Sequence, residues 1–167
     1  EGNPSTRQYG VVDIVGGGRS AAYTGVNCFD YKNHILGQNY AIQGNILLGH
    51  QILESMEVFF LSTAGTFTDR LMAALQAAKV PGADIRCLSS GRSSISAFIR
   101  TARPQDTSGT LYLNLNVNDA PYDMDPIDSL QRLYDRWKLT NDVSEGAVGV
   151  PVTFVLHQNY PNPFNPS

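Results

Sequence analysis

The sequence has little of several features that would point to a common function. Lys and Arg total 12 against 15 Asp and Glu, a formal net charge of −3, so the basic excess typical of nucleic-acid-binding surfaces is absent. No apolar run approaches the roughly 18 residues that a membrane-spanning helix needs. The three histidines, at positions 34, 50 and 157, lack metal-ligand spacing. We therefore expect no nucleic-acid partner, no membrane span, no metal and no cofactor.

What the chain does have is enough material for one domain. It contains 167 residues, 42% of them hydrophobic, which excludes wholesale disorder. It begins at Glu1 without a Met or a signal peptide, and it ends in a proline-rich run from Tyr160 to Ser167. We interpret both ends as cut edges, so the lack of a signal peptide says little about compartment.

The pattern of apolar residues predicts strands at both ends of the folded part. Residues 9–15 and 19–24 form a hairpin around Gly16-Gly17-Gly18, which suits a tight turn better than a phosphate loop because no Gly-Lys-Ser/Thr ending follows. Residues 40–43 form a short third strand. Residues 93–102 and 110–117 alternate apolar and polar side chains, as strands with one buried face do.

Three helices are predicted between and after these strands. Residues 50–61 place Ile52, Leu53, Met56, Phe59 and Phe60 on one face. Thr66 caps a second helix with Asp69 three residues on, and Pro81-Gly82 ends it. Asp125-Pro126 starts the last. An apolar stripe lines the second helix, at Phe67, Leu71, Leu75 and Ala78. The expected buried stripe of the third helix is Ile127, Leu130, Leu133, Tyr134 and Trp137. The order predicts an α+β fold with a largely antiparallel sheet, two antiparallel packed helices and a C-terminal helix.

Five stretches together resemble one bacterial and archaeal family, the domain of unknown function 1028. They are Arg7-Gln-Tyr-Gly-Val-Val-Asp13, Ala22-Tyr-Thr-Gly-Val-Asn-Cys28, Tyr40-Ala-Ile-Gln-Gly-Asn-Ile-Leu-Leu-Gly49, Gly82-Ala-Asp-Ile-Arg-Cys87 and Asp125-Pro-Ile-Asp-Ser-Leu130. The resemblance covers about residues 5–137. It implies a relation to N-terminal-nucleophile hydrolases, in which two antiparallel sheets lie between helix pairs in an αββα sandwich. Residues 1–138 would be the C-terminal portion of such a domain.

One departure from that family bears on function. Members carry an upstream segment before the Arg7 stretch, and in N-terminal-nucleophile enzymes the first mature residue is Thr, Ser or Cys. Glu1 cannot take that role, so we expect this chain alone to be inactive. The upstream segment is expected as a separate chain, or else the chain self-associates through exposed edges.

The last residues resemble a second family. Residues 154–167, with the run Gln-Asn-Tyr-Pro-Asn-Pro-Phe-Asn-Pro, look like the opening of the C-terminal sorting domain of type IX secretion substrates. This implies export to the cell surface or medium, with residues 139–153 as a linker. For an exported protein, the even count of cysteines suggests a Cys28–Cys87 disulfide, worth about 4 kcal/mol on the chain-entropy model. The alternative is two separate buried thiols.

The candidate substrate-binding residues are Gln43, Asn45, Asp84, Arg86 and Ser94. The junction at Gln43 and Asn45 can aim amide groups at a substrate oxyanion, or can simply form a tight turn. Asp84 and Arg86 can orient a polar substrate, or can pair with each other. Ser94 can donate a hydrogen bond into the same cleft or be structural.

Two functions remain open from the sequence. The first is an exported amide hydrolase, acting on peptides such as those of peptidoglycan, whose nucleophile lies outside this chain. The second is a non-catalytic surface binding or structural module. The acidic residues Asp119, Asp123, Asp125 and Asp128 do not match a calcium loop, and the last two suffice to start a helix.

Overall fold

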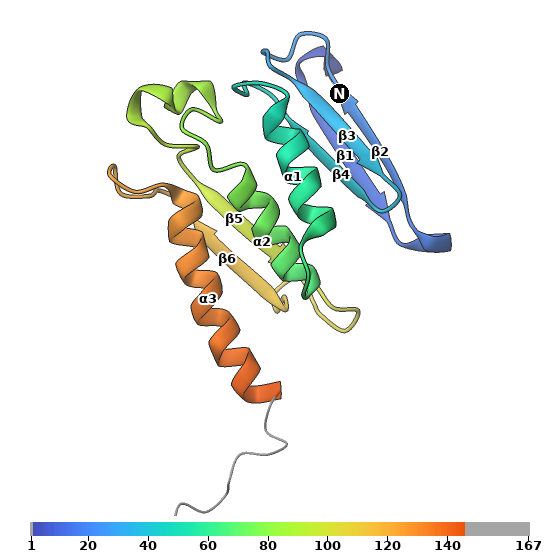
Figure 1. Ribbon diagram of the computed structural model, residues 1–167. Coiled ribbons are helices and arrows are strands. Elements are labelled where there is room, and N and C mark those ends of the chain that lie inside the picture. Colours follow the sequence, from blue (N-terminus) through green and yellow to red (C-terminus); the bar gives the residue numbers. More distant parts are fainter. Residues whose placement is uncertain (1, 146–167) are drawn as a thin grey trace, which may run out of the picture. The chain divides into compact units, whose positions relative to one another are not determined.

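The computed structural model describes residues 2–145, which fall into a first unit up to Tyr134 and a second from Asp135. Within the described part, the strands form three antiparallel pairs, and α-helices follow or separate them (Figure 1). The α+β prediction is therefore confirmed. The elements are η1 Pro4–Thr6, β1 Gln8–Asp13, η2 Val15–Gly17, β2 Arg19–Thr24, β3 Asn33–Gly37, β4 Tyr40–Gly44, α1 Gln51–Ser62, α2 Phe67–Ala77, η3 Ile85–Ser90, β5 Ala97–Thr101, β6 Leu113–Val117 and α3 Pro126–Glu145.

The first hairpin forms where the glycine run predicts it. Strand β1 pairs with β2 from Gln8 opposite Thr24 to Asp13 opposite Arg19. All three turn glycines have positive φ, at 62°, 93° and 96°, which an L side chain rarely adopts. Glycine is therefore required by this turn.

The second hairpin contains a strand that the sequence analysis missed. Strand β3 pairs with β4 across the two-residue turn Gln38-Asn39. Its signal was the polar turn between two short apolar runs. Gln8 joins this hairpin to the first, because its Nε2 donates to the carbonyl oxygens of Asn33, at 3.3 Å, and Gly44, at 2.9 Å.

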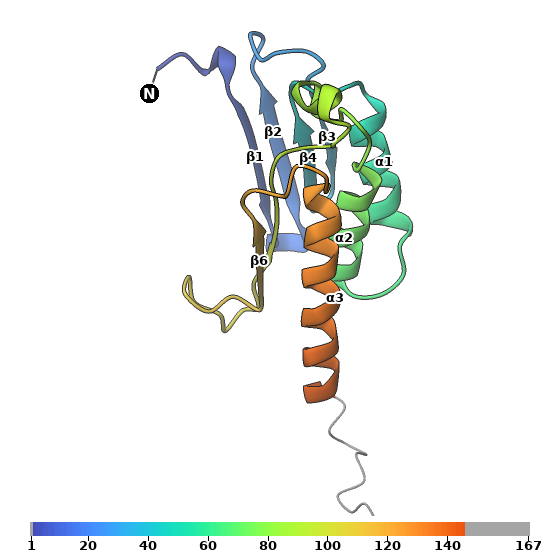
Figure 2. The ribbon, with the colours of Figure 1, turned by 90° about the vertical axis from the view of Figure 1, so that its left-hand side faces the viewer.

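The first unit is layered. Figure 2 shows the β1–β2 hairpin on one side, α1 and α2 on the other, and β3 and β4 between them. The cap of α2 has the predicted form: the Thr66 side chain accepts from the Asp69 N–H, and the Asp69 carboxylate accepts from the Thr66 N–H at 2.9 Å. Arg70 ties the two helices together by donating from Nε to the Phe60 carbonyl oxygen at 2.7 Å.

The best-buried side chains lie where β5, β6, α2 and the start of α3 meet. Leu130 is fully buried and Leu113 is 1% exposed. Tyr134 lies among them, and its hydroxyl donates to Thr68 Oγ1 at 2.9 Å and Asp69 Oδ1 at 2.8 Å. The predicted stripe of the last helix is confirmed for Ile127, Leu130 and Tyr134.

Helix α3 differs from its predicted length. It continues to Glu145, whereas the sequence analysis placed a linker from residue 139. Residues 146–167 lie outside the described residues, and with them the expected start of a sorting domain. No helix in the described part has the length and apolarity to span a membrane.

A groove of about 580 Å³ opens between β4 and β5, and we call it the β4–β5 groove. Its walls include residues 40–43 of β4 and residues 98–100 of β5, and its base includes side chains of α1 and α2. Three residues of the predicted apolar stripe of α2, Phe67, Leu71 and Leu75, line it. Phe67 is 57% exposed, because the stripe faces this groove rather than a filled core.

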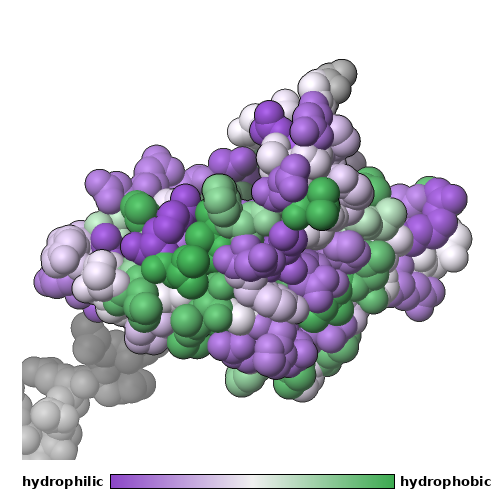
Figure 3. Space-filling model, turned by 90° about the horizontal axis from the view of Figure 1, so that it is seen from above, coloured by the Kyte–Doolittle hydropathy of each residue, from purple (hydrophilic) through white to green (hydrophobic). Residues whose placement is uncertain are grey.

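Apolar surface also occurs away from the groove. The face of the molecule shown in Figure 3 carries apolar patches among polar ones. Among the most exposed apolar side chains are Val26, at 73%, and Phe29, at 74%. Exposed apolar patches of this kind mark surfaces suited to contact with other polypeptide.

Gly25 fixes how the start of the chain packs on the first hairpin. It is buried, and its N–H donates to the Arg7 carbonyl oxygen at 2.9 Å. A Cβ at this position would lie 2.2 Å from the Ser5 carbonyl oxygen and 2.4 Å from its carbon. Because these are backbone atoms, no side-chain movement would relieve the clash.

Candidate functional site

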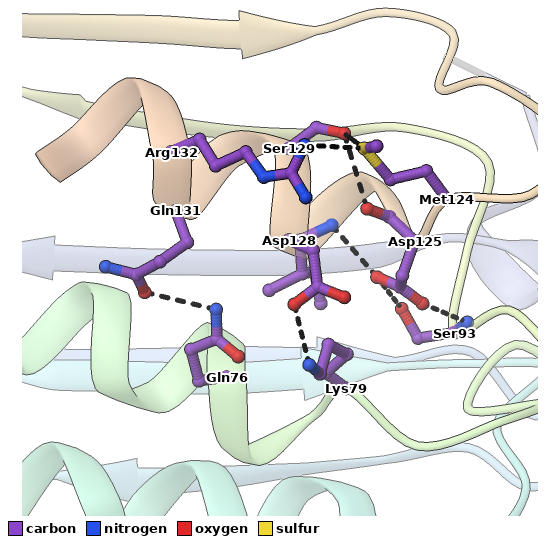
Figure 4. A network of polar contacts seen from close by, with 10 residues as sticks. Gln76, Lys79, Ser93, Met124, Asp125, Asp128, Ser129, Gln131 and Arg132 are labelled. Carbon is purple, nitrogen blue, oxygen red and sulfur yellow. Dashed lines mark hydrogen bonds and ion pairs between the residues drawn. The ribbon is translucent and has the colours of Figure 1, made fainter. Parts of the chain in front are cut away.

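A polar network anchors the loop before β5 to the start of α3 (Figure 4). The Ser93 N–H donates to Asp125 Oδ2 at 2.6 Å, and Ser93 Oγ donates to Oδ1 at 3.0 Å. The same carboxylate caps α3, because Oδ1 accepts from the Ile127 N–H at 2.9 Å. Ser93 is 2% exposed, so this network positions the loop that carries Ser94.

Two further contacts fix α3 against α2. Lys79 Nζ lies 2.6 Å from Asp128 Oδ1, and Gln76 Nε2 donates to Gln131 Oε1 at 3.1 Å (Figure 4). Asp125 and Asp128 therefore have structural partners, as their place at a helix start suggested. Within the described residues, no three His, Cys, Asp or Glu side chains are grouped as a metal site would require.

A cavity of about 180 Å³ lies beside this network and brings together three of the five predicted site residues. Gln43 comes from the end of β4, Asp84 from the loop before η3, and Ser94 from the loop before β5. The rest of its lining includes the apolar side chains of Leu47, Met56 and Ile127. We call this the Asp84 cavity.

Asp84 and Arg86 pair with each other, as one of the two sequence interpretations had it. Arg86 Nε donates to Asp84 Oδ1 at 2.9 Å, and the guanidinium reaches Oδ2 at 2.5 Å. Hydrogen bonding from Arg86 lowers the pKa of the Asp84 carboxyl below its usual value. The carboxylate therefore stays ionised, while the Arg86 side chain is 68% exposed and does not line the cavity.

Ser94 is the third member of the cavity. Its hydroxyl donates to the Ser96 carbonyl oxygen at 3.2 Å, a long contact near the upper limit of hydrogen-bond geometry. Asp84 and Ser94 are brought near each other by the backbone, since the Asp84 N–H donates to the Ser93 carbonyl oxygen at 2.9 Å.

Asn45 points elsewhere. Its Nδ2 donates to Gln8 Oε1 at 2.7 Å, so it joins the hairpins rather than the Asp84 cavity. The next residue, Ile46, has a φ of 60°, a left-handed conformation that is strained for a β-branched side chain. Its N–H donates to the Phe29 carbonyl oxygen, and its carbonyl oxygen accepts from the Ile85 N–H, both at 3.0 Å.

The two cysteines are separate buried thiols. Cys28 is 7% exposed and Cys87 is 4% exposed, and neither is bonded to the other. The disulfide expected from the even count is not formed, and each buried thiol packs as a small apolar side chain. Burial, followed by the charge of Asp84, raises the pKa of the Cys87 thiol. A raised pKa disfavours a nucleophilic thiolate.

Sequence reasoning missed one pair of polar side chains. Thr24 Oγ1 lies 2.9 Å from His34 Nδ1 and accepts from Gln8 Nε2 at 3.0 Å. These residues come from β2, β3 and β1, and the strand β3 was not predicted. No alternation of polar and apolar residues marks His34 in the sequence, because the strand reads Asn33-His-Ile-Leu-Gly37.

Comparison with known proteins identifies a family to which the chain is similar. Residues 1–130 match the sequence model of the family of unknown function DUF1028. The chain belongs to this family.

A solved structure extends the comparison to the DUF1028 fold. The crystal structure of protein SPO2555 from Silicibacter pomeroyi, also of the DUF1028 family, is 28% identical, with a TM-score of 0.59. The match covers 89% of this chain and 59% of that chain. This chain thus spans less than two thirds of that relative. Among curated proteins, none matches significantly.

Proposed function

We propose that this DUF1028 chain forms the substrate-lining part of an amide hydrolase of the N-terminal-nucleophile type. The nucleophile would belong to polypeptide outside the chain. The observation that carries the proposal is the convergence of Gln43, Asp84 and Ser94 on one cavity. The strained backbone at Ile46, three residues after Gln43, supports it, because such strain concentrates at functional sites.

The three side chains offer complementary chemistry. In this type of hydrolysis an N-terminal hydroxyl or thiol attacks the amide carbonyl, its own α-amino group takes the proton and passes it to the leaving amine, and water then hydrolyses the acyl intermediate. The Gln43 amide and the Ser94 hydroxyl supply neutral donors for a carbonyl oxygen. The ionised Asp84 is suited to a substrate N–H or ammonium group.

We further propose that the intact protein is exported and acts on cell-wall peptides. Support comes from the resemblance of residues 154–167 to a sorting domain and from the DUF1028 resemblance. An ionised carboxylate in the cavity suits the free amino groups that such peptides carry.

The second candidate is a non-catalytic surface binding module. It is favoured by the closed Asp84–Arg86 ion pair, which already uses both carboxylate oxygens.

The test uses the full-length product of the gene that encodes this chain. Its mature N-terminal residue is sequenced, and turnover of peptide anilides and soluble cell-wall peptides is measured. We expect Ser, Thr or Cys at the N-terminus, and a fall in kcat/KM of about 10- to 100-fold for Asp84→Asn, in line with a lost charge-assisted contact.

Asp13→Asn is the matched control. Asp13 forms a similar ion pair with Arg19, and hydrogen bonding from Arg19 likewise lowers its pKa, but it lies in the β1–β2 hairpin and does not line the cavity. It should leave kcat/KM unchanged. A full-length product with another N-terminal residue, or with no amide turnover, would exclude the hydrolase and leave the binding module.

A further inference from the structure

We infer that the β4–β5 groove is a docking site for an extended segment of additional polypeptide, which pairs as a β-strand with the open edges of β4 and β5. The segment would belong to a part of the full-length protein that corresponds to the unmatched region of the longer DUF1028 relative. This inference does not depend on hydrolysis. It shares with the proposed function the need for polypeptide outside the chain, and Gln43 lines both the groove and the Asp84 cavity.

The walls of the groove are strand edges with unused hydrogen-bonding groups. In the described part of the chain, β4 pairs only with β3, and β5 pairs only with β6. Besides Gly10 and Val12 of β1, the strands that line the groove are β4 and β5, and neither β3 nor β6 lines it. We therefore infer that the unpaired edges of β4 and β5 face the groove. A strand edge presents a row of N–H and C=O groups that an added strand satisfies.

The base of the groove is apolar and comes from faces that the sequence marks as buried. Met56 and Phe60 of α1 and Leu71 and Leu75 of α2 line it, and all four fall on predicted apolar stripes. Arg100 is the one charged residue in its lining within the described part. An amphipathic helix normally buries such a stripe, so the groove has the character of a core that lacks one layer.

An extended segment fits this groove better than a small apolar ligand does. The volume of about 580 Å³ is within the range of ligand sites, but a small ligand would leave the backbone groups of both edges unpaired. A strand with alternating side chains satisfies the edges and places apolar groups on Leu71 and Leu75.

The length of the relative indicates the source of the segment. Only 59% of the Silicibacter pomeroyi chain is matched, so about two fifths of a protein with this fold lies outside the region that this chain represents. That remainder supplies polypeptide that can complete a layer of the same fold. A second copy of this chain would have to offer a free strand of matching register.

The experiment compares this chain with the full-length product of its gene. Amide hydrogen exchange is measured for residues 40–44 and 97–101. We expect exchange in both strands to slow by at least about tenfold in the full-length product, because edge amides become paired. Phe98, 61% exposed and part of the groove, is replaced by photoreactive benzoylphenylalanine, and the cross-linked peptide is expected to come from outside residues 1–167 of the same product.

Two matched variants test the base of the groove. Leu71→Gln places an amide among its apolar side chains and is expected to reduce the protection of both strands. Leu61→Gln makes the same change on α1, where the side chain is 55% exposed and does not line the groove, and it should leave protection unchanged. Circular dichroism confirms that both variants fold, and Ala41→Pro, which removes a backbone N–H in β4, provides a second disruption if Leu71→Gln does not.

Three outcomes would overturn the inference. One is a full-length product no longer than this chain. Another is a longer product in which β4 and β5 exchange as fast as in the chain alone. The third is a cross-link from position 98 to a second copy of residues 1–167, which would make the groove a homodimer interface. Loss of amide turnover in the functional assay would not affect any of these readouts.

Discussion

The local contacts of a single residue in this protein can be predicted from its neighbours in the sequence. Its long-range contacts become apparent only in the folded structure. Asp125 is an example, since its position before Pro126 predicted the helix start that its carboxylate caps. Its bonds to Ser93 span 32 positions, and no local pattern specifies them. The same limit applies to Asn45, whose partner Gln8 lies 37 positions away. From the sequence, Asn45 could contact a substrate or form a local turn, whereas in the structure it joins two hairpins.

Asp125→Ala should destabilise the protein by about 2–3 kcal/mol. The change removes a helix cap and leaves the buried Ser93 N–H without its acceptor. The measurement is urea unfolding followed by circular dichroism. Asp128→Ala, which removes only the partly exposed pair with Lys79, is the control and should cost less than about 1 kcal/mol. Equal losses in the two variants would contradict the assigned roles.

Among the secondary-structure elements, the helix starts and the alternating strands could be predicted from the sequence, whereas the short strand β3 could not. The caps at Thr66 and Asp125, and the alternation that buries Ile99 and Leu113, rest on neighbouring residues and were predicted. Strand β3 has five residues and follows a turn region without strong signals. The length of α3 was underestimated because the sequence from Leu139 to Glu145 is mostly polar, as linkers are.

Thr66→Ala tests the cap of α2. The Thr66 side chain accepts the N–H of Asp69, and that N–H would lose its partner, so we expect a loss of about 1 kcal/mol in the free energy of unfolding. Thr66→Ser keeps the hydroxyl and should restore most of it. Thermal denaturation of the two variants and the parent chain decides the matter, and an unchanged Thr66→Ala midpoint would count against the capping box.

At the scale of the whole molecule, a periodic apolar stripe predicts that one face of a helix is covered. It does not indicate which part of the protein covers it. The sequence predicts apolar stripes on α1 and α2, and part of each lines the β4–β5 groove. The α+β class followed from the order of elements, whereas the groove depends on which strands sit side by side. Three of the five candidate site residues converge for a similar reason: their loops meet only in the folded chain.

Phe98→Ala should therefore have two different effects. In this chain the side chain is 61% exposed, and its loss should change the free energy of unfolding by less than about 1 kcal/mol. In the full-length product, where we propose that it is covered, the loss should approach the roughly 3 kcal/mol of a buried aromatic. Phe59→Ala, at an exposed position outside the groove, should be mild in both. Chemical denaturation of the four variants and their two parent proteins gives the comparison.

The glycine at position 25 has a consequence for the comparison of homologous sequences. Because backbone atoms of Ser5 occupy the space where a Cβ would stand, the opening turn of the chain and this glycine depend on each other. A homologous gene that encodes alanine or a larger residue here must route its first residues along a different path. In a related sequence, the residue at position 25 therefore indicates whether the segment around Ser5, about twenty residues earlier, can adopt this conformation.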